Sequence, residues 1–292
     1  MPFVSYLQSN PALFYVIAGV FGLIIGSFLN VVIHRLPAMM ERDWRQQCRT
    51  LLDLESPAGE ETEEFNLVRP GSRCPLCGHP ITPLENIPVL SYLVLGGKCS
   101  ACKTAISIRY PVIEILSALL ASFAAWHFGF SLQAILAIVL SWALLTLSVI
   151  DIDHQILPDD IVLPLLWLGI LANIFGVFTD IYSCLFGVMA GYGILWTVYI
   201  LFKKITGKEG MGYGDFKLLA MLGAWLGWQM LPLVILLSSL AGAIVGGGLI
   251  ILRRHDKEIP FSFGPYLALA GWIALYWGNT ITNAYLRWTA TP

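Results

Sequence analysis

Charged residues are scarce in this chain. They make up 12% of its 292 residues, which is about half the share usual in a soluble domain. Apolar residues make up 57%, and this composition excludes a disordered protein, a coiled coil and an ordinary soluble enzyme. A basic excess is also lacking, because the net charge is -2, which argues against a nucleic-acid partner. The remaining class is a protein that crosses a membrane several times.

The first 33 residues contain no charged side chain, and the apolar run 11–33 is long enough to span a bilayer. It lacks the basic start of a signal peptide and is too long for the apolar segment of one. Further apolar runs lie at 111–130, 132–150, 161–178, 181–202, 216–231, 233–252 and 263–285. We therefore expect an all-α membrane protein with about eight transmembrane helices. The run 216–231 is the weakest, so it should lie beside water-filled space or begin below the membrane surface.

The basic residues lie almost entirely on one side of these spans. With eight spans, 16 of the 17 lysines and arginines fall on one side, and Arg287 falls on the other. Basic loops stay in the cytoplasm, so we expect this side to be cytoplasmic and both termini to be periplasmic. Omitting the sixth run would move Arg253, Arg254 and Lys257 outside, so the charge pattern supports eight spans.

One long segment outside the spans divides the chain into three parts. We expect a first transmembrane helix at 1–34, a cytoplasmic loop domain at 35–110 and a seven-helix membrane core at 111–292. The loop domain holds nine basic and nine acidic residues, so it carries no net charge.

Two Cys-x-x-Cys pairs lie in this loop domain, separated by 21 residues. They can supply four thiolates to a tetrahedral zinc ion, and the predicted ligands are Cys74, Cys77, Cys99 and Cys102. Two disulfides or four unpaired buried thiols are the alternatives, and the reducing cytoplasm argues against disulfides. A zinc ion with four thiolate ligands has no open position, so we expect it to fold a loop too small for its own core.

Four carboxylates lie within ten residues between the third and fourth spans. Asp159 and Asp160 precede a helix, where one can cap it and both suit its positive end. Asp151 directly follows an apolar run, and we expect it to remain on the third helix at the membrane edge. For Asp153 the pattern leaves open a supporting role and an exposed position.

A glycine-rich stretch, Gly210-Met-Gly-Tyr-Gly-Asp215, opens the sixth run. Its glycines disfavour a helix and permit close approach of the backbone. The stretch is not a P-loop, because no Gly-Lys-Ser/Thr ends it, and no soluble strand precedes it as in a dinucleotide-binding turn. Taken alone, Asp215 fits the N-cap of the helix that follows.

Asp151 and Asp215 are expected on the same cytoplasmic edge, at the ends of apolar helices. Carboxylates in a membrane cost about 2.5–3.5 kcal/mol on insertion scales, so they are candidates for function. Two that lie close together share a proton, and one can then activate water while the other protonates a leaving amine. This is aspartic peptidase chemistry, although an ion-coupled transporter also uses buried carboxylates. Apart from Glu114 the span centres are nearly free of ionisable groups, which counts against the transporter.

Together these motifs resemble those of the type IV prepilin peptidases, also called prepilin leader peptidase/N-methyltransferases. The matching stretches are the two cysteine pairs, GSFLNVVIHRLP at 26–37, ISIRYPVIE at 106–114, DIDH at 151–154 and GMGYGDFK at 210–217. They extend from the first span to the sixth, and no motif position departs from the family's pattern.

The resemblance implies an enzyme of the bacterial inner membrane that serves type IV pili and type II secretion. Asp151 and Asp215 would form the catalytic pair that cleaves prepilins and pseudopilins after the glycine ending a short basic leader. Bifunctional members then methylate the new N-terminal amine with S-adenosylmethionine, and the four cysteines indicate this type. The expected partners are these substrates and membrane lipids, without nucleic acid.

Three functions stay open at this point. The first is the bifunctional peptidase and methyltransferase, and the second is a peptidase whose zinc loop only recognises substrate. The third is an ion-coupled transporter with a zinc-bound regulatory loop. No sequence motif marks the S-adenosylmethionine site, and only by elimination does the cysteine loop remain for it.

Overall fold

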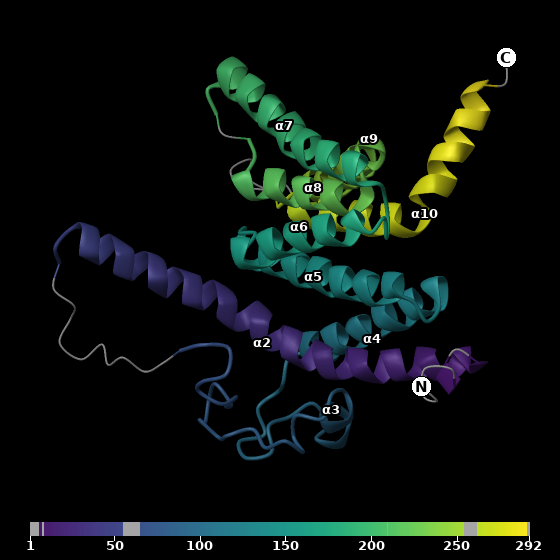
Figure 1. The fold of residues 1–292 in the computed structure, drawn as a ribbon. Coiled ribbons are helices and arrows are strands. Elements are labelled where there is room, and N and C mark those ends of the chain that lie inside the picture. Colours follow the sequence, from purple (N-terminus) through teal and green to yellow (C-terminus); the bar gives the residue numbers. More distant parts are fainter. Residues whose placement is uncertain (1–5, 8, 55–64, 209, 254–261, 291–292) are drawn as a thin grey trace. The chain divides into compact units, whose positions relative to one another are not determined.

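The computed structural model describes residues 6–7, 9–54, 65–208, 210–253 and 262–290. Its helices are Pro11–Leu51 (α2), Leu90–Val94 (α3), Arg109–Phe128 (α4), Leu132–His154 (α5), Asp159–Ile174 (α6), Ile181–Thr206 (α7), Tyr213–Leu226 (α8), the 3-10 turn Trp228–Met230 (η1), Leu231–Arg253 (α9) and Gly264–Ala290 (α10) (Figure 1). The described residues form no β-strand, only two isolated bridges. The expected all-α class is therefore confirmed.

Each of the eight predicted apolar runs forms a helix. Five helical segments are long and apolar enough to cross a membrane: Pro11–Leu51, Arg109–Phe128, Leu132–His154, Ile181–Thr206 and Trp228–Gly248. Two others, α6 and α8, have only 16 and 14 residues, and α10 contains several tyrosines, tryptophans and asparagines that make it less apolar. Arg254 and Lys257, which the charge pattern placed in the cytoplasm, lie outside the described residues.

The chain forms two compact units, residues 1–134 and 135–292. In the first unit, α2 and α4 pack closely because glycines on α2 leave room for the backbone of α4. A Cβ atom at Gly26 would lie 2.6 Å from the Cα atom of Glu114, and the Ser117 hydroxyl donates to the Gly22 carbonyl at 2.6 Å. Past the predicted span, α2 continues through Pro37 to Leu51 as one helix.

In the second unit, α8 lies among α6, α7 and α10 (Figure 1). From Asp215 to Leu226, every side chain except Lys217 is buried. A helix that is apolar on all sides needs such an enclosure. Its 14 residues span about 21 Å at 1.5 Å per residue, less than the hydrocarbon core of a bilayer. Enclosure by other helices, rather than contact with lipid, explains how a weak apolar run is accommodated.

Glycine contacts bring α7 and α8 together. A Cβ atom at Gly187 would lie 2.3 Å from the main-chain oxygen of Gly223, and one at Gly191 would lie 2.6 Å from that of Leu219. Neither position can accept a larger residue unless the helices separate.

Asn173 on α6 fixes the end of α8. Its amide nitrogen donates to the carbonyls of Ala224 at 2.7 Å and Trp225 at 3.2 Å. Its amide oxygen accepts from the main-chain N–H groups of Phe178 and Thr179. The side chain is 1% exposed, so it satisfies four main-chain groups within an apolar interior. The short helix is thereby held in one register.

Candidate functional site

The buried face of α5 ends at Asp151. On this helix Ala137, Leu140, Leu144 and Leu147 are buried, at intervals of three or four residues. These intervals place them on one helical face, and Asp151 follows four residues later on the same face. The Asp151 side chain is 5% exposed. The expectation that Asp151 remains on the third predicted helix is confirmed.

Residues at the start of α10 hold Asp151. The main-chain N–H of Gly264 donates to Oδ2 of Asp151 at 3.1 Å, and the Ser262 hydroxyl donates to the main-chain carbonyl of Asp151 at 2.8 Å. A Cβ atom at position 264 would lie 2.7 Å from the same Oδ2. Any larger residue would therefore displace the carboxylate.

Asp215 lies in the first turn of α8, where Gly212 is the N-cap. Asp215 is thus the third residue of the helix, and the expectation that it is the cap itself is wrong. The Gly212 main-chain N–H hydrogen-bonds to the Asp215 carboxylate, as side chains at this helix position often do. The Asp215 side chain is 8% exposed.

Leu157, in the connection between α5 and α6, contacts the surroundings of both aspartates. A Cβ atom at Gly214 would lie 2.9 Å from the Cβ atom of Leu157. A Cβ atom at Gly264 would lie 3.2 Å from Cδ2 of the same leucine. Glycine at position 214 therefore lets the loop before Asp215 pack closely against this connection.

The fold brings the two aspartates together, because Leu157 packs both against Gly264, which contacts Asp151, and against Gly214, which directly precedes Asp215. Both side chains are buried, so water screens their repulsion only weakly, and one shared proton relieves it. Such a pair has one member ready to accept a proton and one ready to donate a proton.

Asp159 binds Lys217 at the same end of the second unit. The Lys217 Nζ donates to both carboxylate oxygens of Asp159, at 2.8 and 2.6 Å. The expectation that Asp159 or Asp160 caps α6 is wrong, because the N-cap is Pro158 and no side chain makes the capping hydrogen bond. Asp159 instead connects the first turn of α6 to that of α8. Asp153 and Asp160 are exposed.

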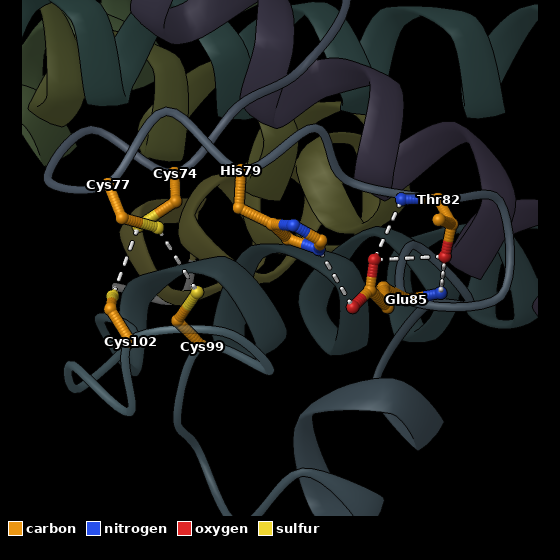
Figure 2. A network of polar contacts seen from close by, with 7 residues as sticks. All are labelled: Cys74, Cys77, His79, Thr82, Glu85, Cys99 and Cys102. Carbon is orange, nitrogen blue, oxygen red and sulfur yellow. Dashed lines mark hydrogen bonds and ion pairs between the residues drawn. The ribbon is translucent and has the colours of Figure 1, made fainter.

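The four cysteines of the loop domain form one cluster in the first unit (Figure 2). All four sulfurs lie within 4.8 Å of one another, with Cys74 Sγ 3.8 Å from Cys102 Sγ and Cys77 Sγ 4.0 Å from Cys99 Sγ. A tetrahedral zinc ion with bonds of about 2.3 Å would place its sulfurs about 3.8 Å apart. All four cysteines are free, so the disulfide alternative is wrong. The donor set fits a metal ion.

The two cysteine pairs are held by equivalent turns. The N–H of Gly78 donates to the Cys74 carbonyl, and the N–H of Lys103 donates to the Cys99 carbonyl, both at 3.0 Å. Hydrogen bonds from the Thr104 side chain and backbone lower the pKa of Cys102 to about 6. The shift favours the metal-binding thiolate at Cys102, whereas at Cys77 a hydrogen bond from the His79 backbone is outweighed by desolvation and the other three cysteines, which raise the pKa to about 11.

Glu85 contacts residues beside both cysteine pairs, and Figure 2 shows its contacts with Thr82 and His79. Its carboxylate accepts from the N–H and hydroxyl of Thr82 at 2.8 and 2.9 Å and lies 3.4 Å from His79 Nε2, beside the first pair. A hydrogen bond from the side chain of Ser100, between the cysteines of the second pair, contributes most to lowering its pKa to about 2, followed by the bonds from Thr82. Glu85 is therefore an anion that contacts His79 beside the first cysteine pair and Ser100 within the second.

Glu114 connects the loop domain to α4. Its Oε2 accepts from the main-chain N–H of Val89 at 2.8 Å. Val89 has a φ of 60°, which is unfavourable for a β-branched residue, so the buried carboxylate supports a strained turn. The polar partner of Glu114 is thus a main-chain group of the loop domain.

In comparisons with known proteins, two family profiles match the parts of the chain that contain the cysteine cluster and the aspartate pair. The profile of the Bacterial Peptidase A24 N-terminal domain matches residues 20–128, and that of the Type IV leader peptidase family matches residues 138–247. The chain is 58% identical over 287 residues to the prepilin leader peptidase/N-methyltransferase of Pseudomonas aeruginosa, covering 98% of both chains. This chain belongs to the type IV leader peptidase family.

Other members of the type IV leader peptidase family are also similar over nearly their whole length. The prepilin leader peptidase/N-methyltransferase of Aeromonas salmonicida is 54% identical over 276 residues, which is 94% of this chain and 95% of the relative. That of Xanthomonas campestris is 45% identical over 284 residues, which is 97% of this chain and 98% of the relative. No solved structure matches the chain.

Sequence reasoning missed three residues of these sites. Ser262 and Gly264 contact Asp151 from a part of the chain more than 100 residues away, and no local sequence pattern predicts such a contact. Glu85 did have a local signal, because Thr82-Pro-Leu-Glu85 has the spacing of a capping box, in which the two side chains bond to each other's main chain.

Proposed function

We propose that this chain cleaves the leader peptide from type IV prepilins and type II secretion pseudopilins at the inner membrane and then methylates the new N-terminus. The observation that carries the peptidase proposal is the meeting of Asp151 and Asp215 at buried helix ends. Family membership supplies the substrate class, since the relatives carry the name prepilin leader peptidase/N-methyltransferase.

The aspartate pair can perform peptide hydrolysis without a covalent intermediate. One carboxylate accepts a proton from water as the water oxygen bonds to the scissile carbonyl carbon. The other carboxyl group donates its proton to the amine nitrogen as the carbon–nitrogen bond breaks. The Asp159–Lys217 ion pair holds the first turn of α8, and with it Asp215, against the start of α6.

The cysteine cluster fits a structural zinc ion held by Cys74, Cys77, Cys99 and Cys102. Four thiolates leave no open position, so a bound ion would supply folding free energy and not a reactive water. Through Glu114 and Val89 the loop domain is also tied to α4. We assign residues 35–110 to a cytoplasmic loop domain, between a first transmembrane helix at 1–34 and a membrane core at 111–292.

For the second activity, S-adenosylmethionine would supply the methyl group. The chain's own task would be to bring the newly formed amine to this donor, and the loop domain is the part outside the predicted spans that is large enough to do so. The cytoplasmic side follows from the basic residues, and it places both termini in the periplasm.

One experiment tests both activities. The purified, lipid-reconstituted protein is incubated with S-adenosylmethionine and a prepilin-like peptide that carries a basic leader ending in glycine. Mass spectrometry should find cleavage after the glycine and one added methyl group on the new N-terminus. Cleavage without methylation would reduce the function to a peptidase with a recognition loop, and a folded protein without cleavage would overturn the proposal.

A further inference from the structure

The start of α10 contacts Asp151 through residues that have no role in the two-aspartate mechanism described above. Gly264 is the first residue of this 27-residue helix, Ser262 lies two residues before it, and both are far from Asp151 in the sequence. Both donate a hydrogen bond to Asp151: the Ser262 hydroxyl to its main-chain carbonyl at 2.8 Å and the Gly264 N–H to its Oδ2 at 3.1 Å. The backbone and the side chain of Asp151 are thus both held from one segment.

The donor at Gly264 has a specific electrostatic character. The first N–H groups of a helix have no partner within the helix, and they lie at the positive end of its dipole. A carboxylate that accepts from such a group is stabilised as an anion. Asp215 also accepts from an N–H at a helix N-terminus, that of the N-cap Gly212, but this group belongs to the helix that carries Asp215 itself, whereas Asp151 is held from a separate segment.

We propose that Ser262 and Gly264 are positioning residues that hold Asp151 as the water-activating carboxylate. This inference rests on the proposed function and assigns one of its two proton transfers to each aspartate. Asp151 takes the proton from water as the new carbon–oxygen bond forms, and Asp215 gives its proton to the leaving nitrogen. Transfer of the proton from Asp151 to Asp215 restores the pair.

The proposal also explains why glycine occupies position 264. A Cβ atom there would lie 2.7 Å from Oδ2 of Asp151 and 3.2 Å from Cδ2 of Leu157. The Leu157 side chain also packs against Gly214 beside Asp215, so it has little freedom to move away. An alanine would therefore move the carboxylate.

The test measures cleavage and methylation separately. Gly264→Ala should lower kcat for prepilin cleavage about 100-fold, the usual effect of displacing a catalytic group by about 1 Å. Its KM should stay unchanged, as should methyl transfer to a peptide that already has the free N-terminus. Ser262→Ala should lower kcat about fivefold by removing one hydrogen bond. Gly193→Ala on α7 is the control, because nothing lies within 4 Å of its new Cβ atom.

Full kcat in Gly264→Ala would overturn the proposal, and so would a rise in KM without a fall in kcat. If Gly264→Ala fails to fold, Ser262→Ala decides: a folded protein with unchanged kcat overturns the proposal, and a lowered kcat with unchanged KM supports it. A different result would show that the proposed function itself is wrong. Cleavage by Asp151→Asn would reject the aspartate pair itself, whatever the Gly264 variant does.

Discussion

At the residue scale, the ion pair between Asp159 and Lys217 connects the starts of two helices. Both side chains are partly exposed, so the pair contributes only about 0–1 kcal/mol to stability. Its geometry is nevertheless specific, because one ammonium group meets both carboxylate oxygens. Lys217 also lies two residues after Asp215, so the main effect of the ion pair should be on the position of Asp215.

We predict that Lys217→Asp and Asp159→Lys each lower prepilin cleavage about tenfold, since each leaves two like charges facing one another. The double variant, Asp159→Lys with Lys217→Asp, should recover most of the activity, while the melting temperature changes little in all three. Cleavage rates and thermal melts measure this. A double variant as poor as the single ones would show that Lys217 acts on substrate and not through Asp159.

The second prediction at this scale concerns Glu85, which contacts His79 beside the first cysteine pair and Ser100 within the second. Purified wild-type protein should hold about one zinc ion per chain. Glu85→Gln should weaken zinc binding about tenfold in a competition with a chelator, at the lower end of the usual effect of residues around a metal site.

Glu41→Gln is the matched control for Glu85→Gln, because Glu41 forms an exposed ion pair with Arg45 on α2 and lies away from the cluster in the chain. Equal zinc affinity of wild type and Glu85→Gln would show that the cluster assembles without this carboxylate. Absence of zinc from wild type with reduced thiols would instead reject the metal site.

At the scale of helices, the sequence was informative where a pattern is local. Apolar runs predicted α2 and α4 to α10 in the part of the chain that the structure describes, and the 3.6-residue period placed Asp151 on the buried side of α5. The continuation of α2 to Leu51 was not predicted, because its last turns are polar and carry no apolar periodicity. The hydrogen bond from Gly264 to Asp151 joins distant parts of the chain, and only the packing of α5 against α10 creates it.

The packing of α7 on α8 gives a third prediction. Gly187→Ala would place a Cβ atom 2.3 Å from the main-chain oxygen of Gly223, so the helices must separate. We expect a loss of about 1–3 kcal/mol in stability and a marked loss of cleavage, because α8 carries Asp215. Thermal unfolding in detergent and cleavage rates measure both effects.

Gly193→Ala lies on the same helix and meets no atom within 4 Å, so it should leave stability unchanged or raise it by up to about 1 kcal/mol. If Gly187→Ala were as stable and active as Gly193→Ala, close contact between α7 and α8 would not be needed for function.

At the scale of the whole molecule, each of the two compact units contains one of the two profile matches. The first unit contains the cysteine cluster and the N-terminal family domain, and the second contains both aspartates and the peptidase profile. The methyl-donor site could not be predicted, because no local motif or cluster of polar residues marks it.

The orientation in the membrane is also a property of the whole chain. Native Cys48, exposed on the extension of α2, should be protected from a membrane-impermeant thiol reagent in intact cells. A cysteine introduced by Thr289→Cys, at an exposed position near the end of α10, should react. Lysed cells should show labelling of both. Labelling of Cys48 in intact cells would invert the proposed topology.

Asp151 and Asp215 are proposed as the catalytic pair, and cleavage of a prepilin-like peptide by three single variants tests this pairing. Asp151→Asn and Asp215→Asn should each abolish cleavage while the protein stays folded, since each removes one partner in proton transfer. Asp153→Asn, at an exposed position two residues after Asp151, should cleave like wild type. Full cleavage by either of the first two variants would show that Asp151 and Asp215 are not the catalytic pair.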